Sequence, residues 1–363
     1  MVSSSKNRTD RRKSLRIGFV PLCDSAPLVM ASELGLFARH GLAVELSREV
    51  GWASVRDKVL FRELDAAQAP AATVFAASLG LGSFKVRCVT GLVLNQQGNA
   101  ITLSKRLWDA GVRDGETLRE YIRAHRHERR LTFGVAFSFS SHNYLLHKWL
   151  IANEIHPKQD VNIAVVPPPQ MVRNLQAGNL EGYCVGEPWN SVALLENAGW
   201  IVATSRSIAP CHPEKVLLVR QEFAERRAEE HRQLIAALYE ACRFCDEPEN
   251  RECLIRTMAG PRYLNADPAA LRNSFAGPFN LGQSRSEAGS LFHIFNANNA
   301  NEPGLDKAAW VFGSLVETGL VSAVPSSDRQ ALLGCFRADI FHSAVDPGEA
   351  RLCRSAPLLA QGP

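Results

Sequence analysis

Hydrogen-bond donors recur in this chain at positions where loops are expected to meet strands or helices. Trp52, in the segment GWASVRD, can donate one hydrogen bond from its indole N–H, although it could equally fill a core. Asn99 follows LVLNQQG and offers an amide, although alone it marks a turn. His142, in SSHN at an expected helix start, can contact an anion, although a lone histidine can also be structural. Together these residue types could bind a small oxyanion.

Two further segments add a rigid turn and a positive charge. Pro168 lies in VPPPQ, which is typical of a strand-to-helix turn. Lys215, in CHPEK, opens an expected strand, where an ammonium is costly to bury unless a negative partner lies opposite. We interpret a bound anion as that partner. One ammonium and a few neutral N–H donors could then replace the hydration shell of a monovalent oxyanion, which a cage of carboxylates would repel.

The elements that must position these residues alternate between strands and helices. This alternation predicts an α/β chain with parallel, helix-covered sheets. We expect residues 15–99 to form the first part of lobe I and residues 100–210 to form lobe II. Residues 211–350 are expected to return to lobe I and to end in helices. A cleft between two such lobes, lined by strand ends and helix N-termini, suits a small anion.

Composition excludes several classes of protein. The 363 residues are 46% hydrophobic and 21% charged, which is typical of a globular chain, and no apolar run approaches the ~20 residues that cross a bilayer. The net charge of +4 comes from the first 16 residues, since the rest of the chain sums to −1. No direct nucleic-acid contact is therefore expected. Residues 1–14 are predicted to be a disordered basic tail, and residues 351–363 a frayed one.

Catalytic and metal-binding patterns are missing from the sequence. There is no GxSxG elbow, P-loop or HExxH, and the nine cysteines lack paired ligand spacing, so we predict reduced thiols, no metal and no cofactor. Cys242 and Cys245 are spaced for core packing on a helix. His125 and His127, in AHRHERR, indicate a solvated charged helix face. Glu187, in VGEPWN, is interpreted as part of a turn between the lobes, so no catalysis is assigned.

Seven segments in order resemble the nitrate-binding proteins of the NrtA/CmpA type, in cluster II of the periplasmic-binding-protein-like superfamily. They are GFVPLCDSAPLVMASELGLF, GWASVRDKV, LNQQGNAITLS, SSHNYLLHKWL, VPPPQMV, YCVGEPWN and HPEKVLLV. The resemblance implies a two-lobed fold with nitrate in the interlobe cleft. It places the ligand contacts on Trp52, Asn99, His142 and Lys215, with Pro168 and Gly186 lining the site. The family's amide is often Gln, so Gln97 is an alternative to Asn99.

The start of the chain bears on its place in the cell. The first residues are polar and basic and show no apolar signal-peptide region, so we expect a cytoplasmic protein. Within the resemblance, members without export signals look like NasS, the nitrate/nitrite sensor. Such sensors hold an RNA-binding ANTAR-domain antiterminator, NasT-like, inactive until the anion binds, and so control nitrate assimilation genes.

We therefore expect a sensor of this kind. One alternative is the substrate-binding component of a nitrate/nitrite or bicarbonate ABC transporter. A second is an enzyme similar to the thiamine-pyrimidine synthases, whose cysteine-rich iron motif does not occur here.

Overall fold

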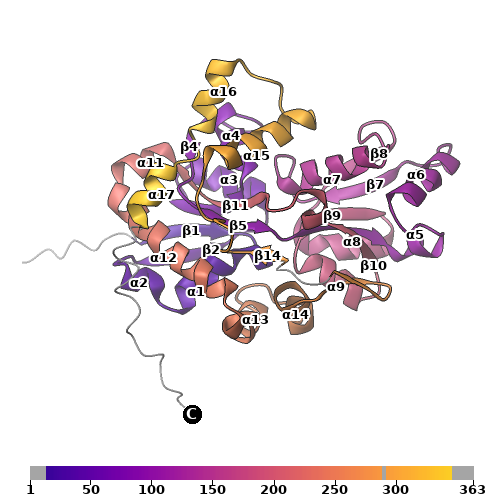
Figure 1. The fold of residues 1–363 in the computed structure, drawn as a ribbon, viewed down its shortest axis with the longest axis horizontal. Coiled ribbons are helices and arrows are strands. Elements are labelled where there is room, and N and C mark those ends of the chain that lie inside the picture. The colour runs from indigo at the N-terminus through magenta and orange to yellow at the C-terminus, as the bar shows by residue number, and fades with distance from the viewer. Residues whose placement is uncertain (1–13, 288–291, 346–363) are drawn as a thin grey trace, which may run out of the picture.

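The computed structural model describes residues 14–287 and 292–345. Both expected tails lie outside these residues, apart from Ser14. Two sheets organise the chain, one at the left and one at the right of Figure 1. We call each sheet, with the helices that cover it, the first and the second lobe.

The first lobe holds a seven-stranded sheet with β11 near its centre. Its strands are, in order, β14 (His293–Ile294), β5 (Val93–Gln97), β11 (Pro213–Arg220), β3 (Ala66–Pro70), β1 (Leu15–Phe19) and β2 (Val44–Arg48), with β4 (Cys88–Val89) also paired to β11. The second lobe holds a five-stranded sheet. Its order is β10 (Gly199–Thr204), β6 (Asn99–Ser104), β9 (Gly182–Gly186), β7 (Leu131–Val135) and β8 (Val161–Val165).

Helices cover both faces of each sheet (Figure 1). The chain of the first lobe forms α1 (Ala26–Glu33), α2 (Leu36–Arg39), α3 (Trp52–Leu60), α4 (Ala72–Leu79), α11 (Gln221–Arg226), α12 (Ala228–Asp246), α13 (Arg251–Ala259), α14 (Pro268–Ala276), α15 (Leu305–Glu317), α16 (Ser326–Leu333) and α17 (Ala338–Ala344), with the 3-10 turns η1 (Cys23–Ser25) and η3 (Pro248–Asn250). The second lobe forms α5 (Lys105–Asp109), α6 (Gly115–Ala124), α7 (Ser141–Ala152), η2 (Pro168–Gln170), α8 (Met171–Ala177), α9 (Trp189–Leu195) and α10 (Ser205–Ile208).

Strand β11 shows why the first sheet is buried on both sides. Its sequence PEKVLLVR is buried throughout. Val216 and Leu218 belong to the apolar core that includes Phe75 of α4, whereas Leu217 and Val219 belong to the core that includes Leu234 of α12. Successive side chains of a strand point to opposite faces, so an apolar run without polar alternation predicts a sheet covered on both faces.

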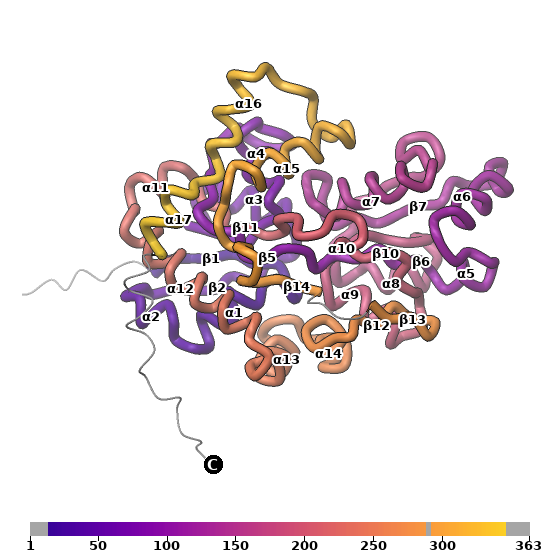
Figure 2. The backbone as a smooth tube through the Cα atoms, viewed as in Figure 1, coloured from indigo at the N-terminus to yellow at the C-terminus, as the bar shows by residue number. Residues whose placement is uncertain are grey.

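The expectation of parallel sheets is correct for only part of each sheet. Strand β1 runs parallel to β2 and β3, and β7 runs parallel to β8 and β9. Strand β11, however, is antiparallel to β3 and β5, and β6 is antiparallel to β9 and β10. The chain crosses to the second lobe between β5 and β6 and returns between β10 and β11 (Figure 2), so the strands flanking these crossings enter the sheets in the opposite direction.

Part of the C-terminal segment packs on the second lobe, although residues 211–350 were expected in lobe I. Strands β12 (Phe279–Gly282) and β13 (Arg285–Glu287) form a two-stranded pair beside β10. Phe279 is buried in a small apolar cluster with Ala100 and Ile201 of the second sheet. Burial of this phenyl ring explains why the segment leaves the first lobe before β14 returns to it.

Candidate functional site

One edge of the first sheet gathers three of the polar residues. Asp24 lies in η1, just after β1, and Trp52 begins α3, just after β2. Lys215 pairs with Pro70 at the end of β3, because β11 is antiparallel to β3 and therefore starts at this edge. The ends of parallel strands β1, β2 and β3 thus meet the beginning of β11 at one place.

The facing edge of the second sheet supplies the other residues. Asn99 starts β6 and pairs with Gly186 at the end of β9. His142 lies in the first turn of α7, after β7, and Pro168 begins η2, after β8. All four are buried.

Short distances join the site residues, both within the first lobe and between the two lobes. The ammonium of Lys215 lies 5.3 Å from the ring centroid of Trp52. A methyl group at Gly186 would lie 3.3 Å from both Oδ1 of Asn99 and Oδ2 of Asp24, so these two side chains converge on the glycine. Trp52, Asn99, His142 and Lys215 are each no more than 1% exposed. The site is therefore enclosed between the lobes.

Several polar atoms in this enclosed site lack a hydrogen-bond partner within the described residues. They are Nε1 of Trp52, both amide atoms of Asn99 and both ring nitrogens of His142. Leaving a buried polar group unpaired costs about 1–3 kcal/mol, so such a cluster indicates that something else occupies its hydrogen bonds. An indole N–H, an amide NH₂ and an imidazole N–H together suit a ligand that accepts hydrogen bonds.

Lys215 does not meet the expectation that a bound anion is its negative partner. Its Nζ lies 2.7 Å from Oδ2 of Asp24 and 2.5 Å from Oε1 of Glu214, and all three side chains are buried. Asp24 also accepts a hydrogen bond from Nε2 of Gln68. Neither carboxylate was among the predicted site residues, because negative charge is expected to repel an anion. Their signals were present, since Asp24 follows the first strand and Glu214 precedes Lys215.

Burial and charge shift the pKa values in the site. Burial, together with the Lys215 charge, lowers the pKa of His142 to about 3, so its imidazole is neutral near neutral pH. Burial raises the pKa of Asp24. Burial opposes ionisation of Glu214 too, but the charge of Lys215 and a hydrogen bond with His212 outweigh it and lower its pKa. Burial disfavours the ammonium, yet Asp24 and Glu214 raise the pKa of Lys215 above its ordinary value.

Glu214 connects the two lobes. It accepts a hydrogen bond from the hydroxyl of Ser141, at the start of α7 in the second lobe. Nε2 of His142 lies 3.9 Å from the same carboxylate oxygen. The other oxygen lies 2.9 Å from Nε2 of His212. The carboxylate of Glu214 is therefore contacted by Lys215 and His212 and, from the other side of the cleft, by Ser141.

The geometry favours Asn99 over Gln97 as the source of an amide. Nε2 of Gln97 lies 3.9 Å from the sulfur of Cys211, in the segment between β10 and β11, so it points toward that crossing. Both amide atoms of Asn99 are unpartnered among the described residues. Pro168 offers no polar side-chain atom, and none of the hydrogen bonds or ion pairs described above reaches it.

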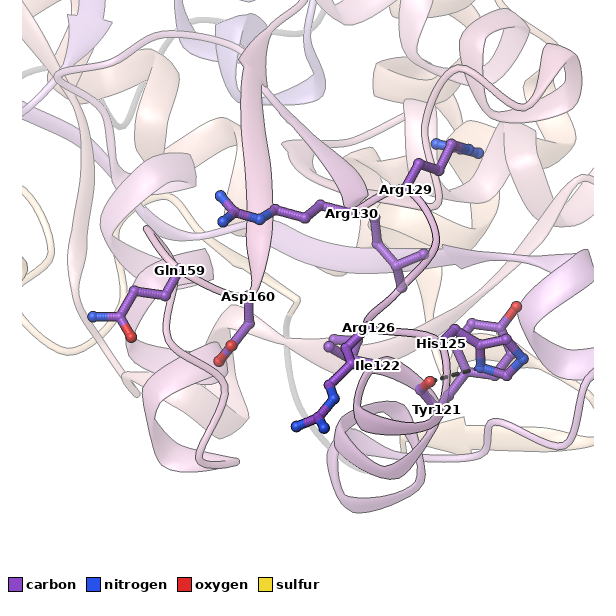
Figure 3. A pocket seen from close by; sticks show the side chains of 9 residues that line it. Tyr121, Ile122, His125, Arg126, Arg129, Arg130, Gln159 and Asp160 are labelled. Atoms are coloured by element: carbon purple, nitrogen blue, oxygen red, sulfur yellow. Dashed lines mark hydrogen bonds between the residues drawn. The ribbon is translucent and has the colours of Figure 1, made fainter.

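Two open pockets lie elsewhere. One, of about 440 Å³, lies beside the crossing segment and is lined by residues that include His212 and Trp310. The other, of about 160 Å³, lies in the second lobe at the end of α6, where Arg126, Arg129 and Arg130 are among the residues that line it (Figure 3). There the imidazole of His125 stacks on Tyr121. Neither pocket includes Trp52, Asn99, His142 or Lys215.

Residues set aside as structural have structural partners. Cys242 and Cys245 of α12 are buried in the apolar core, and the thiol of Cys242 lies 3.4 Å from the carbonyl of Leu94. Glu187 accepts hydrogen bonds from the Ser274 hydroxyl and the Ser191 amide, and burial raises its pKa.

Over residues 14–287 and 292–345, no three His, Cys, Asp or Glu side chains are grouped to hold a metal ion. Within the same residues, no helix has the length and hydropathy that a bilayer span requires.

Comparison with known sequences identifies the family. The sequence model of the NMT1-like family matches residues 8–259. The chain belongs to this family. It is 38% identical over 335 residues to the nitrate import ATP-binding protein NrtC of Synechocystis sp.. The aligned residues cover 91% of this chain and 50% of NrtC. It thus spans about half the length of this relative, as it does of the bicarbonate transport ATP-binding protein CmpC of the same organism.

Other relatives match over a larger share of their length. Identity to the nitrate/nitrite binding protein NrtA of Synechococcus elongatus is 28% over 345 residues, which is 92% of this chain and 77% of NrtA. The crystal structure of the periplasmic nitrate-binding protein NrtA from Synechocystis PCC 6803 superposes with a TM-score of 0.86 at 24% identity, covering 94% of this chain and 89% of that one. The resemblance to NrtA/CmpA-type proteins and the two-lobed α/β fold are confirmed.

Proposed function

We propose that this protein binds a small monovalent oxyanion, nitrate or nitrite first and bicarbonate as an alternative, as the substrate-binding component of an ABC-type import system. The observation that carries the proposal is the enclosed cluster of unpartnered donors on Trp52, Asn99 and His142 beside the ammonium of Lys215. The relatives support it, since they are named for binding or importing nitrate, nitrite or bicarbonate.

Binding would use donors from both lobes. Trp52 and Lys215 come from the first lobe, and Asn99 and His142 come from the second. Nitrate and nitrite accept hydrogen bonds but cannot donate them, so they match an indole, an amide and an imidazole that donate. Because the anion would contact both lobes only when they are closed, it would shift the protein toward the closed form.

The two carboxylates favour a ligand of low charge. Asp24 and Glu214 together carry more negative charge than Lys215 can balance, so a dianion would add two negative charges to a buried site that already holds two. Desolvating that extra charge is costly in a low-dielectric interior. We therefore expect sulfate to be rejected.

Calorimetric titration of the purified chain with nitrate, nitrite, bicarbonate and sulfate tests the proposal. At least one of the three monovalent anions should bind, and sulfate should not. Asn99→Ala should weaken binding by about 1–2 kcal/mol, because one hydrogen bond to a charged acceptor is lost. Asn179→Ala, at an exposed asparagine of the second lobe, is the matched control and should bind as the wild type does. Absence of heat with every anion, or an unchanged affinity in Asn99→Ala, would contradict the proposal.

The finer interpretation, a cytoplasmic sensor that releases an ANTAR-domain antiterminator, stays a prediction. The relatives reported above are named for nitrate import or for nitrate/nitrite binding, and they favour the transporter alternative. A pull-down of the antiterminator with and without nitrate tests the sensor. The sensor would be favoured if nitrate abolished capture of the antiterminator and if the full-length protein were found in the cytoplasmic fraction.

A catalytic function receives less support. The relatives NrtA and CmpA are named as binding proteins, although one structure of the same fold is that of the desulfurization enzyme DSZB, with a TM-score of 0.57 and 14% identity. Cys242 and Cys245 of α12 are buried in the apolar core and offer no cysteine-rich iron site. We therefore propose no reaction.

A further inference from the structure

The imidazole of His212 is held so that it must share a proton with Glu214. Its Nδ1 lies 2.8 Å from the carbonyl oxygen of Ala209, and its Nε2 lies 2.9 Å from Oε2 of Glu214. A carbonyl oxygen can only accept, so Nδ1 carries a hydrogen. A hydrogen bond between Nε2 and the carboxylate then requires a second proton between them. The pair is therefore an imidazolium beside a carboxylate, or its equivalent with the proton on Glu214.

This proton changes the charge of the whole site. Lys215 is one cation for two carboxylates, Asp24 and Glu214, and His142 is neutral near neutral pH. With the proton on His212, the four charged groups balance. Without it, the buried site carries one excess negative charge before any anion enters. An anion would then bring a second uncompensated charge into a low-dielectric interior.

His212 also lies where a proton can reach it. Although buried, it lines the pocket of about 440 Å³ beside the segment between β10 and β11. The indole ring of Trp310 in α15 lies 5.5 Å from the imidazole ring. The titratable or charged groups that face His212 or share its pocket are Glu214 and Lys215 of β11, His142 of α7, Cys211, Glu302 in the segment before α15, and Asp306 and Lys307 of α15.

We propose that His212 is a positioning residue that carries the proton which anion binding requires, so that the protein takes up its anion together with one proton at any pH where the free protein has lost that proton. This inference rests on the proposed function. Apart from this protonation no covalent bond is made or broken, and a proton restored to the His212–Glu214 pair on binding offsets the charge that the anion adds. His212 acts through Glu214, which in turn holds Lys215 and Ser141.

Linkage fixes the direction of the pH dependence. Where His212 is already protonated in the free protein, anion binding takes up no proton and its affinity is independent of pH. Where the free protein has lost that proton, binding must restore it. The dissociation constant then rises by up to about tenfold for each pH unit.

Calorimetric titration with nitrate from pH 6 to 9 tests this inference. Nitrate is the anion of a strong acid and carries no titrating proton in this range, so any proton taken up belongs to the protein. At each pH the titration is repeated in buffers of different ionisation enthalpy, such as PIPES, imidazole and Tris. The slope of observed enthalpy against ionisation enthalpy gives the number of protons. We expect a rise toward one proton at high pH, together with weakening affinity.

Two variants assign the proton to His212. His212→Gln can still donate a hydrogen bond to Glu214 but has no titrating group, so its nitrate affinity should be flat over the same pH range and its heats should not depend on the buffer. His125→Gln is the matched control, because its Nδ1 also lies 2.8 Å from a backbone carbonyl, that of Tyr121, while its ring stacks on that tyrosine rather than facing a site carboxylate. It should keep the wild-type pH profile.

The outcomes separate this inference from the function on which it rests. Nitrate binding with a flat pH profile and buffer-independent heat in the wild type would overturn the inference and leave the anion-binding function standing. Proton uptake that persists in His212→Gln would also overturn it, as would binding that depends on an added metal cation instead of a proton. No heat with nitrate, nitrite or bicarbonate at any pH would overturn both the function and the inference.

Discussion

Lys215 stabilises the fold in addition to its proposed role in anion binding. Its ammonium neutralises two buried carboxylates, Asp24 and Glu214, and these in turn hold Gln68 and Ser141. Removing one partner of a buried ion pair leaves an uncompensated charge, which destabilises far more than the loss of an exposed pair. The lysine therefore cannot be tested as a ligand contact alone.

Lys215→Met should lower the free energy of unfolding by about 3–5 kcal/mol, because it leaves both carboxylates without their cation. Urea unfolding measures the change. Lys105→Met is the matched control, since Lys105 pairs with Asp109 at an exposed position of α5, and its cost should stay below about 0.5 kcal/mol. Equal, small costs in both variants would mean that the buried ion pairs contribute little.

Trp52→Phe should weaken nitrate binding by about 1–2 kcal/mol, which corresponds to a factor of roughly 5–30. Phenylalanine keeps an aromatic ring near the Lys215 ammonium and removes only the unpartnered indole N–H. Calorimetry measures the affinity. Trp108→Phe, at a half-buried tryptophan of the second lobe, should bind nitrate as the wild type does. A Trp52→Phe variant with wild-type affinity would remove the indole N–H from the proposed contacts.

Sequence reasoning found the donors of the site but not its carboxylates. Trp52, Asn99, His142 and Lys215 stand in separate segments with recognisable side-chain chemistry, and the sheet edges bring them together. Asp24 was missed because its importance depends on the distance to Lys215, which the sequence does not contain. Burial of an ammonium predicts a negative partner, but the sequence alone does not tell whether that partner is a ligand or a side chain.

At the scale of elements, the crossing from β5 to β6 depends on one glycine. Gly98 adopts φ +94°, and a methyl group there would lie 2.2 Å from Nδ1 of His293 in β14. The backbone conformation and the close ring therefore both exclude a larger residue. This crossing fixes the position of Asn99, the next residue along the chain.

Gly98→Ala should reduce the free energy of unfolding for two reasons, the left-handed conformation and the collision with His293. Gly111→Ala separates them, because Gly111 has φ +95° and a methyl group there meets no atom within 4 Å. We expect about 1 kcal/mol for Gly111→Ala from the backbone alone, and at least about 2 kcal/mol more for Gly98→Ala. Urea unfolding of both variants decides, and equal losses would show that the collision is relieved without cost.

The presence of the strands and helices could largely be predicted from the sequence. The break within a helix and the directions in which strands pair could not. Apolar runs, some of them alternating with polar residues, predict strands at β1, β2, β7 and β8, because a strand buried on both faces is apolar throughout and one buried on a single face alternates. The helical stretch after β1 is divided into α1 and α2 at Gly35, which has φ +67°. Antiparallel pairing of β11 depends on where the chain re-enters the sheet, which local sequence does not encode.

At the scale of the whole molecule, the site lies closed between two lobes that contribute different donors. Without an anion, the closed form would leave the Trp52, Asn99 and His142 nitrogens unpartnered and buried. Each such group costs about 1–3 kcal/mol, so the open form should gain in population when the anion is removed. The free protein is therefore expected to be less compact than the loaded one.

Small-angle X-ray scattering in chloride and then in nitrate measures this change. The radius of gyration should decrease when nitrate is added, because the lobes close on the anion and exclude water. The Asn99→Ala variant at a nitrate concentration too low to saturate it should remain near the chloride value. Identical scattering of the wild type in both salts, with nitrate binding established by calorimetry, would show that the lobes do not separate.

Enclosure of the site also bears on how long an anion stays. Because Trp52, Asn99, His142 and Lys215 are each no more than 1% exposed, no ion can escape by slipping past a mobile side chain at the surface. The anion can dissociate only when the lobes open, so its residence time is set by how often they open. Anions that stabilise the closed form equally should then dissociate at similar rates, even if their association rates differ.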